Sequence, residues 1–135
     1  MTTIVLDTDT LSAIMRQDST ALSVARQYLS VHESLTVSII TRFEILRGLM
    51  AKNATSRVSA FNATCAAMDV LPLNDAIIVR AASIYGQLHR AGNLIGDADI
   101  LIAATCLENA HALATNNTAH FSRITGLVVE NWLAK

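Results

Sequence analysis

The sequence contains few of the residues that mark linkers, disulfide scaffolds or membrane spans. Its 135 residues include one proline, five single glycines and two cysteines, so no segment indicates an interdomain linker or a disulfide framework. Every apolar run ends well before the roughly 18 residues that a spanning helix needs, and the N-terminus lacks the basic and apolar regions of a secretion signal. We therefore expect one domain over residues 1–135, located in the cytoplasm, with Cys65 and Cys106 as reduced core residues.

Positive charge is also scarce. The formal net charge is −1 and the pI is about 6.4, whereas a general nucleic-acid binder usually has a domain pI above roughly 9. Any nucleic acid must therefore be bound locally, with metal ions supplying positive charge at an acidic site. Hydrophobic residues make up 52% of the chain, which is more than one small core needs, so we expect partner chains to cover part of the surface.

Segments typical of strands and of helices alternate along the chain. Short apolar runs such as residues 4–6 suit strands that are buried on both faces, and apolar residues at spacings of three and four predict helices. The expected strands are 4–6, 35–38, 69–71, 111–115 and 126–129, and the expected helices are 10–16, 20–31, 40–52, 57–68, 74–90 and 97–108. This order predicts an α/β fold with a central, mainly parallel sheet flanked by helices.

In an open parallel sheet, ligands bind outside the carboxyl ends of the strands. This rule brings Asp7, after the first strand, to the same edge as Thr41 and residues 115–117. Asp7 directly follows three apolar residues, where a buried carboxylate is costly unless it is paired. We interpret Asp7 as a site residue. The alternative is that it caps the next helix, a role that we assign mainly to Asp9.

Two further carboxylates are predicted to reach this edge. Glu44 lies one helical turn after the second strand, with Gly48 leaving room for a ligand on the same face; a surface ion pair with Arg47 is the alternative. Asp97 and Asp99 open an apolar helix, and helix N-termini stabilise carboxylates. Residues two apart lie about 200° apart around a helix, so only one can face the site. We choose Asp99 and assign Asp97 to capping or to a supporting position.

Three carboxylates from distant positions suit a hard divalent cation. Magnesium and manganese take oxygen ligands and pair with phosphate, and two such ions can promote phosphodiester hydrolysis. The four histidines have no zinc-ligand spacing, no glycine-rich phosphate loop is present, and no serine or cysteine has a supporting base motif. Asp7, Glu44 and Asp99 therefore favour Mg²⁺- or Mn²⁺-dependent chemistry.

Together with their neighbours, these residues resemble the PIN-domain family, and within it the VapC-type toxins of bacterial toxin–antitoxin pairs. The resemblance rests on five segments in order, 4–9, 38–48, 95–104, 114–121 and 126–132. It implies a magnesium- or manganese-dependent endoribonuclease that acts on RNA, is inhibited by a small antitoxin and is usually a homodimer. By position, Asp7, Glu44 and Asp99 match the acidic metal-binding residues and Thr115 the hydroxyl residue that supports them. Thr8 is grouped with the supporting residues.

Two positions depart from the family pattern. The first motif commonly reads Asp-Thr-Asn, and Asp9 here adds charge near the site. The fourth acidic residue of many members falls at Asn117, which weakens a second metal site and favours one ion at rest, with a second arriving alongside RNA. Candidates for RNA contact, by proximity, are Arg16, Arg42, Arg47 and Lys52.

Two other functions compete with the nuclease. A haloacid-dehalogenase-like phosphohydrolase would use Asp7 and Asp9 as nucleophile and acid, but Leu11 replaces its expected threonine or valine and Lys52 would have to bind the phosphate. A non-catalytic PIN-like binding module would keep the fold and use its surface for partners, which the three carboxylates argue against. The helices after Thr10 and Thr20 are candidates for docking an antitoxin helix, or are simply core.

Overall fold

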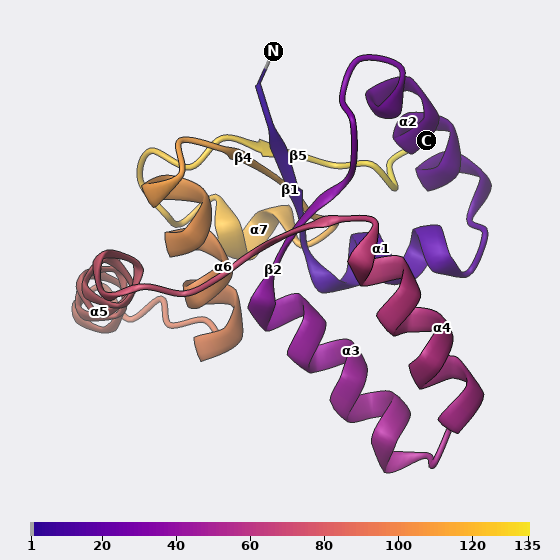
Figure 1. Ribbon diagram of the computed structural model, residues 1–135. Coiled ribbons are helices and arrows are strands. Elements are labelled where there is room, and N and C mark those ends of the chain that lie inside the picture. The colour runs from indigo at the N-terminus through magenta and orange to yellow at the C-terminus, as the bar shows by residue number, and fades with distance from the viewer. Residues whose placement is uncertain (1) are drawn as a thin grey trace.

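The computed structural model describes residues 2–135, in which strands and helices alternate (Figure 1). The strands are β1 (Ile4–Leu6), β2 (Thr36–Ser38), β3 (Asp69–Leu71), β4 (Ala112–Ala114) and β5 (Val129–Glu130). The helices are α1 (Thr8–Met15), α2 (Ser19–Leu29), α3 (Ile39–Ala51), α4 (Thr55–Ala66), α5 (Asp75–Arg90), α6 (Asp97–Glu108) and α7 (Thr118–Phe121). All the predicted elements are present, although the last strand begins at Val129, and the short helix α7 is additional.

The five strands form one parallel sheet in the order β3-β2-β1-β4-β5. The predicted α/β fold with a parallel sheet is therefore confirmed. Because β1 pairs with both β2 and β4 in parallel, the carboxyl ends of these three central strands lie at the same edge. Asp7, Ser38 and Thr115, which directly follow or end these strands, are all buried there.

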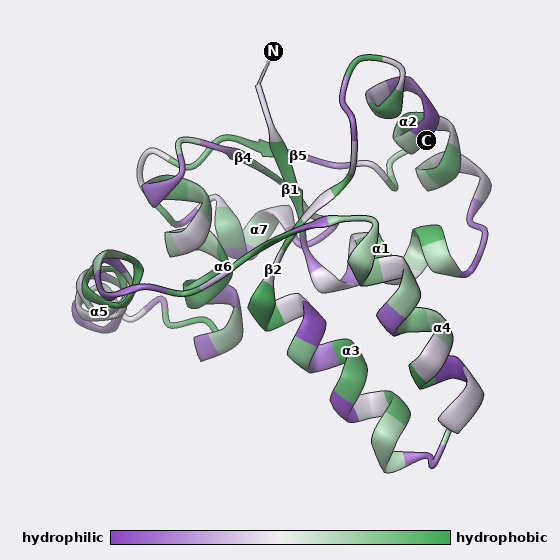
Figure 2. Cartoon of the chain, viewed as in Figure 1, coloured by the Kyte–Doolittle hydropathy of each residue, from purple (hydrophilic) through white to green (hydrophobic). Residues whose placement is uncertain are grey.

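Helices cover both faces of the sheet, and alternate side chains of each strand supply two cores. Val5 and Leu113 pack with apolar residues of α5 and α6, whereas Ile4 and Leu6 point to the opposite face, toward α1, α2 and α4. Figure 2 shows β1 and β4 as mainly hydrophobic ribbons at the centre. This burial on both faces explains why the strand sequences are continuous apolar runs rather than alternating patterns.

Both cysteines lie in these cores. Cys65 and Cys106 are buried and free, as expected, and burial raises the pKa of the Cys106 thiol to about 12. Within residues 2–135, no helix has the length and apolar character needed to cross a bilayer.

The C-terminal segment closes the core that α2 and α4 share. Trp132 is only 2% exposed, its ring centroid lies 5.4 Å from that of Tyr28, and its indole N–H donates to Glu130 Oε1 at 3.1 Å. The Tyr28 hydroxyl in turn accepts the backbone N–H of Ile4 at 3.1 Å. Residues from α2, β1 and the C-terminus are thereby joined in one buried cluster.

The start of α1 corrects one expectation. The helix begins at Thr8 rather than near Thr10, and its N-cap is Asp7, whose Oδ1 accepts the backbone N–H of Thr10 at 2.9 Å. The assignment of capping to Asp9 was therefore wrong, because Asp9 is exposed in the first turn. The reason is that β1 leads directly into α1, so the first residue after the strand has the extended backbone that an N-cap requires.

Candidate active site

Asp7 is the most enclosed carboxylate at the carboxyl edge of the sheet. Its side chain is 5% exposed, and its backbone N–H donates to the carbonyl of Ala114 at 3.0 Å, which links the end of β1 to the end of β4. Burial raises the pKa of Asp7, while interactions with the Thr115 hydroxyl and with Thr10 lower it and the charge of Asp9 raises it further. The carboxylate is thus desolvated and near another negative charge, so a cation would stabilise it.

Glu44 reaches the same edge from the second turn of α3. Ser38 caps this helix through a 3.0 Å hydrogen bond from the Ile40 N–H to its Oγ, so α3 starts directly at the end of β2. The hydroxyl of Thr8 donates to Glu44 Oε1 at 2.6 Å, and Arg47 Nη2 lies 3.5 Å from Oε2. The ion pair with Arg47 that was the alternative for Glu44 is therefore present, and the other carboxylate oxygen is turned toward Thr8.

Asp99 lies half-buried in the first turn of α6. Burial is the largest cause of its raised pKa, followed by the negative charges of Asp7 and Glu44, whereas His120 lowers it. Charges repel appreciably only at short range, so Asp7 and Glu44 lie near Asp99. The three residues chosen from the sequence are therefore brought together, from β1, α3 and α6.

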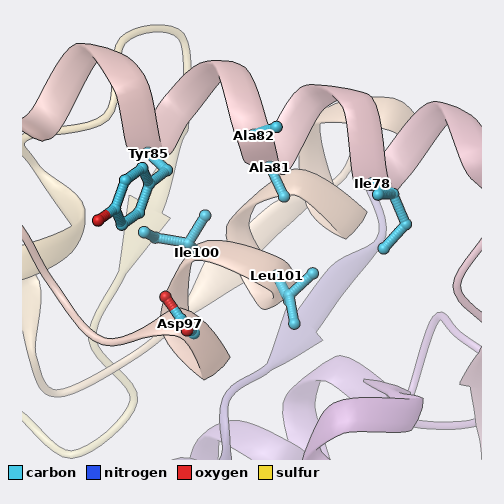
Figure 3. Close-up of a pocket in the computed structure, with 7 residues that line it drawn as sticks. All are labelled: Ile78, Ala81, Ala82, Tyr85, Asp97, Ile100 and Leu101. Atoms are coloured by element: carbon cyan, nitrogen blue, oxygen red, sulfur yellow. The ribbon is translucent and has the colours of Figure 1, made fainter.

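Asp97 is directed elsewhere. It lies at the mouth of a groove between α5 and α6, where Tyr85 and Ile78 of α5 face Ile100 and Leu101 of α6 (Figure 3). The N-cap of α6 is Gly96, and no side chain completes the cap. The capping role expected for Asp97 was therefore wrong: α6 begins one residue earlier than a cap at Asp97 requires. The choice of Asp99 over Asp97 as the residue near Asp7 agrees with the structure.

A chain of polar contacts continues from β4 toward Asp99. Thr115 is fully buried, and its Oγ1 accepts the backbone N–H of Asn117 at 2.9 Å. The Asn117 side-chain nitrogen lies 2.7 Å from Nδ1 of His120, and this ring nitrogen lies 3.8 Å from Oδ2 of Asp99. Sequence reasoning missed His120. The available signal was its place three residues after Asn117, one helical turn further along the same face.

The donor set suits a hard divalent cation. Asp7, Glu44 and Asp99 supply only oxygen, and desolvation and mutual repulsion disfavour the charges of Asp7 and Asp99 in the protein alone. No three acidic, histidine or cysteine side chains of residues 2–135 are already gathered as ligands of one ion. The chemistry of the residues fits Mg²⁺ or Mn²⁺.

The four basic residues expected near the site differ in their positions. Arg47 is beside Glu44. Arg42 is engaged with α4, where it donates to Asn62 Oδ1 at 3.0 Å and lies over the ring of Phe61. Arg16 and Lys52 line a separate groove. Of the four, only Arg47 pairs with one of the three carboxylates.

A family model described as PIN domain matches residues 4–127. The chain therefore belongs to the PIN domain family, and within that family it is of the VapC ribonuclease type. The haloacid-dehalogenase-like alternative was wrong.

The relatives agree with this placement. Ribonuclease VapC1 of Methanocaldococcus jannaschii is 33% identical over 88 residues, covering 65% of this chain and 62% of that protein. Ribonuclease VapC1 of Haemophilus influenzae is 27% identical over 128 residues, covering 94% and 96%. The crystal structure of VapBC2 from Rickettsia felis, bound to a promoter DNA fragment, contains a chain of the same fold. That chain has a TM-score of 0.85 and 21% identity, with 96% of this chain and 98% of that one covered.

Proposed function

We propose that this VapC-type ribonuclease cleaves RNA internally by hydrolysing phosphodiester bonds, with Mg²⁺ or Mn²⁺ held by Asp7, Glu44 and Asp99. The feature that supports this most is that Asp99 lies near enough to Asp7 and Glu44 for their charges to raise its pKa, so that three carboxylates from distant segments are neighbours. A bound divalent ion would supply a polarised phosphate and an activated water. If the protein were a non-catalytic binding module, the three neighbouring carboxylates would have no role.

The protein's own groups orient these acids. Asp7 is held by the Thr10 N–H and by Thr115. Thr8 has a single hydroxyl proton and donates it to Glu44 at 2.6 Å, so the proton of the 3.2 Å contact with Thr41 comes from Thr41. This gives a relay from the buried Thr41 through Thr8 to Glu44. Such contacts hold the carboxylates in place before substrate arrives.

The deciding experiment is the substitution Asp7→Asn. Asparagine caps a helix about as well as aspartate, so the fold should persist while one anionic ligand is lost. We expect Mn²⁺-dependent RNA cleavage to fall at least about 100-fold, and Mn²⁺ binding measured by titration calorimetry to weaken. The matched control is Asp69→Asn, at the opposite end of the sheet, which should cleave like the wild type. Equal cleavage by Asp7→Asn would contradict the proposal.

We further propose that a small antitoxin docks in the groove between α1, α3 and α4. The groove has a volume of about 620 Å³, an apolar floor that includes Ile45, Leu49 and Phe61, and a basic rim formed by Arg16, Lys52 and Arg57. These features suit an apolar segment that carries acidic residues. A toxin–antitoxin complex from Klebsiella pneumoniae contains a chain of this fold.

We also propose a homodimer through α3 and α5. Six of the exposed large apolar side chains lie on these two helices, namely Ile39, Phe43 and Met50 on α3 and Ile78, Val79 and Tyr85 on α5. Apolar side chains that gather into a contiguous exposed patch mark an interface between chains. Such an interface would account for part of the high hydrophobic content of the sequence.

A further inference from the structure

We propose that His120 contacts the RNA backbone by donating a hydrogen bond from Nε2 to a phosphate oxygen next to the metal-binding acids. The proposal rests on the proposed active site. The ring lies on α7, which follows β4 at the carboxyl edge of the sheet, and its Nδ1 is 3.8 Å from Oδ2 of Asp99. The side chain is 42% exposed, so a substrate held at Asp99 would also meet this ring.

Asn117 determines which ring nitrogen carries the proton. Its side-chain nitrogen lies 2.7 Å from Nδ1 of His120, and an amide nitrogen can only donate a hydrogen bond. In this contact Nδ1 accepts, and we infer that the neutral ring carries its proton on Nε2. Within residues 2–135, no protein group is hydrogen-bonded to Nε2, so this N–H is available to a ligand.

The position of Asn117 is itself fixed by the fold. Its backbone N–H donates to the buried Oγ1 of Thr115 at 2.9 Å, and the backbone N–H of Thr115 donates to the carbonyl of Glu130 in β5 at 2.9 Å. These two hydrogen bonds fix Asn117 relative to the sheet, and Asn117 in turn orients the imidazole. A donor that is oriented before binding loses little conformational freedom when the ligand arrives.

The same arrangement excludes the ring from the metal. A metal binds a lone pair of imidazole, but here the Nδ1 lone pair is used by Asn117 and Nε2 carries the proton. A carboxylate at position 117 would accept a hydrogen bond from Nδ1–H and leave a lone pair on Nε2, giving the opposite tautomer. Asparagine therefore makes His120 a donor, and the anionic phosphate oxygens of RNA are the acceptors that a site beside a cation would hold.

Nuclear magnetic resonance of the ¹⁵N-labelled histidines tests the tautomer directly. At about pH 8.5, where free imidazole is neutral, the wild type should show the proton of His120 on Nε2. Asn117→Asp should move it to Nδ1. A wild-type ring with its proton on Nδ1 would overturn the proposal without touching the assignment of the acidic residues.

Binding of a fluorescein-labelled RNA stem-loop in EDTA tests the contact itself. We expect His120→Ala to bind about ten-fold more weakly than the wild type, since a hydrogen bond to a charged group is lost. His120→Gln, whose amide nitrogen reaches the position of Nε2, should recover most of the affinity, and His120→Asn should not. His111→Gln, at the opposite end of β4, is the control and should bind like the wild type.

Calorimetric titration with Mn²⁺ separates a phosphate contact from a metal ligand. His120→Ala should bind Mn²⁺ within two-fold of the wild type. A larger loss of Mn²⁺ affinity, or RNA binding equal to the wild type, would overturn the role of His120 while wild-type cleavage still supports the nuclease. A wild type that neither binds nor cleaves RNA would overturn both.

Discussion

At the scale of single residues, Asp7 serves the fold and the proposed site at once. One of its oxygens caps α1, and the same carboxylate is buried close to the charge of Asp9. The cap hydrogen bond favours the charged form, but burial outweighs it, because the pKa is raised overall. The residue is therefore held rigidly in a state that a cation would stabilise.

The cost of burying the Asp99 carboxylate near other negative charges can be tested through the pH dependence of the free energy of unfolding. Its pKa is raised above 3.8 in the folded state, so the folded protein binds this proton more tightly than the unfolded chain does. Stability in EDTA should consequently fall as the pH rises from about 4 through the raised value and then level off.

Asp99→Asn removes this charge. Its melting temperature should exceed that of the wild type at pH 7, and the difference should shrink toward pH 4, as followed by scanning calorimetry in EDTA. Asp69→Asn, at an exposed position at the start of β3, serves as the control. A difference between Asp99→Asn and the wild type that does not change with pH would contradict the proposed repulsion.

At the scale of elements, two helices enter the site directly from strands. β1 ends at Leu6 and α1 begins at Thr8, while β2 ends at Ser38 and α3 begins at Ile39. With so little chain between the elements, the first turn of each helix must lie at the edge of the sheet. Thr8 and Glu44 are thus brought within 2.6 Å although 36 residues separate them.

The C-terminal segment stabilises the core that α1, α2 and α4 form on one face of the sheet. Trp132 packs against Tyr28 and is almost fully buried. Trp132→Ala should lower the free energy of unfolding by about 3–5 kcal/mol, measured by urea denaturation. Trp132→Phe, which keeps an aromatic ring, should cost less than Trp132→Ala. An equal loss in both variants would show that the indole N–H bond to Glu130 matters more than packing.

At the scale of the whole molecule, the groove and the apolar helix faces share α3 but otherwise use different elements. The proposed antitoxin groove uses α1, α3 and α4, which are seen with α3 and α4 running side by side in Figure 1. The proposed dimer face uses the exposed apolar residues of α3 and α5. Substitutions on α4, which only the groove uses, and on α5, which only the dimer face uses, can therefore test the two interactions separately.

Ala60→Trp tests the groove. Ala60 lines it, so a bulky ring there should fill the space and weaken the complex with a co-expressed antitoxin at least about ten-fold, as measured by calorimetry, while RNA cleavage stays unchanged. Ala66→Trp, also exposed on α4 but outside the groove lining, should bind the antitoxin normally. Unchanged binding by Ala60→Trp would place the antitoxin elsewhere.

Val79→Glu tests the dimer. Val79 is 61% exposed on α5, and a carboxylate buried between two chains without a partner is strongly unfavourable. Light scattering after gel filtration should report a dimer for the wild type and a monomer for Val79→Glu. The control is Ala67→Glu, at an exposed position after α4. A dimer in Val79→Glu would exclude α5 from the interface.

Much of the fold and part of the site were predictable because they depend on local patterns. Continuous apolar runs identified the strands, helical spacing identified the helices, and the strand-end rule brought Asp7, Glu44 and Asp99 to one edge. The cap assignments to Asp9 and Asp97 were wrong because cap positions depend on where the backbone turns, within one or two residues. His120 was missed because the four-residue helix α7 was not predicted, so its spacing of three from Asn117 was not read as a helical turn.

The sequence by itself determined the α/β architecture and the presence of acids at strand ends, since hydrophobic periodicity and residue chemistry act locally along the chain. Only the tertiary structure decided which of these groups meet. The pairing of Thr8 with Glu44, the repulsion among the three carboxylates and the contact of Asn117 with His120 depend on distances between elements. Those distances are set by how strands and helices pack, which no pattern of neighbouring residues specifies.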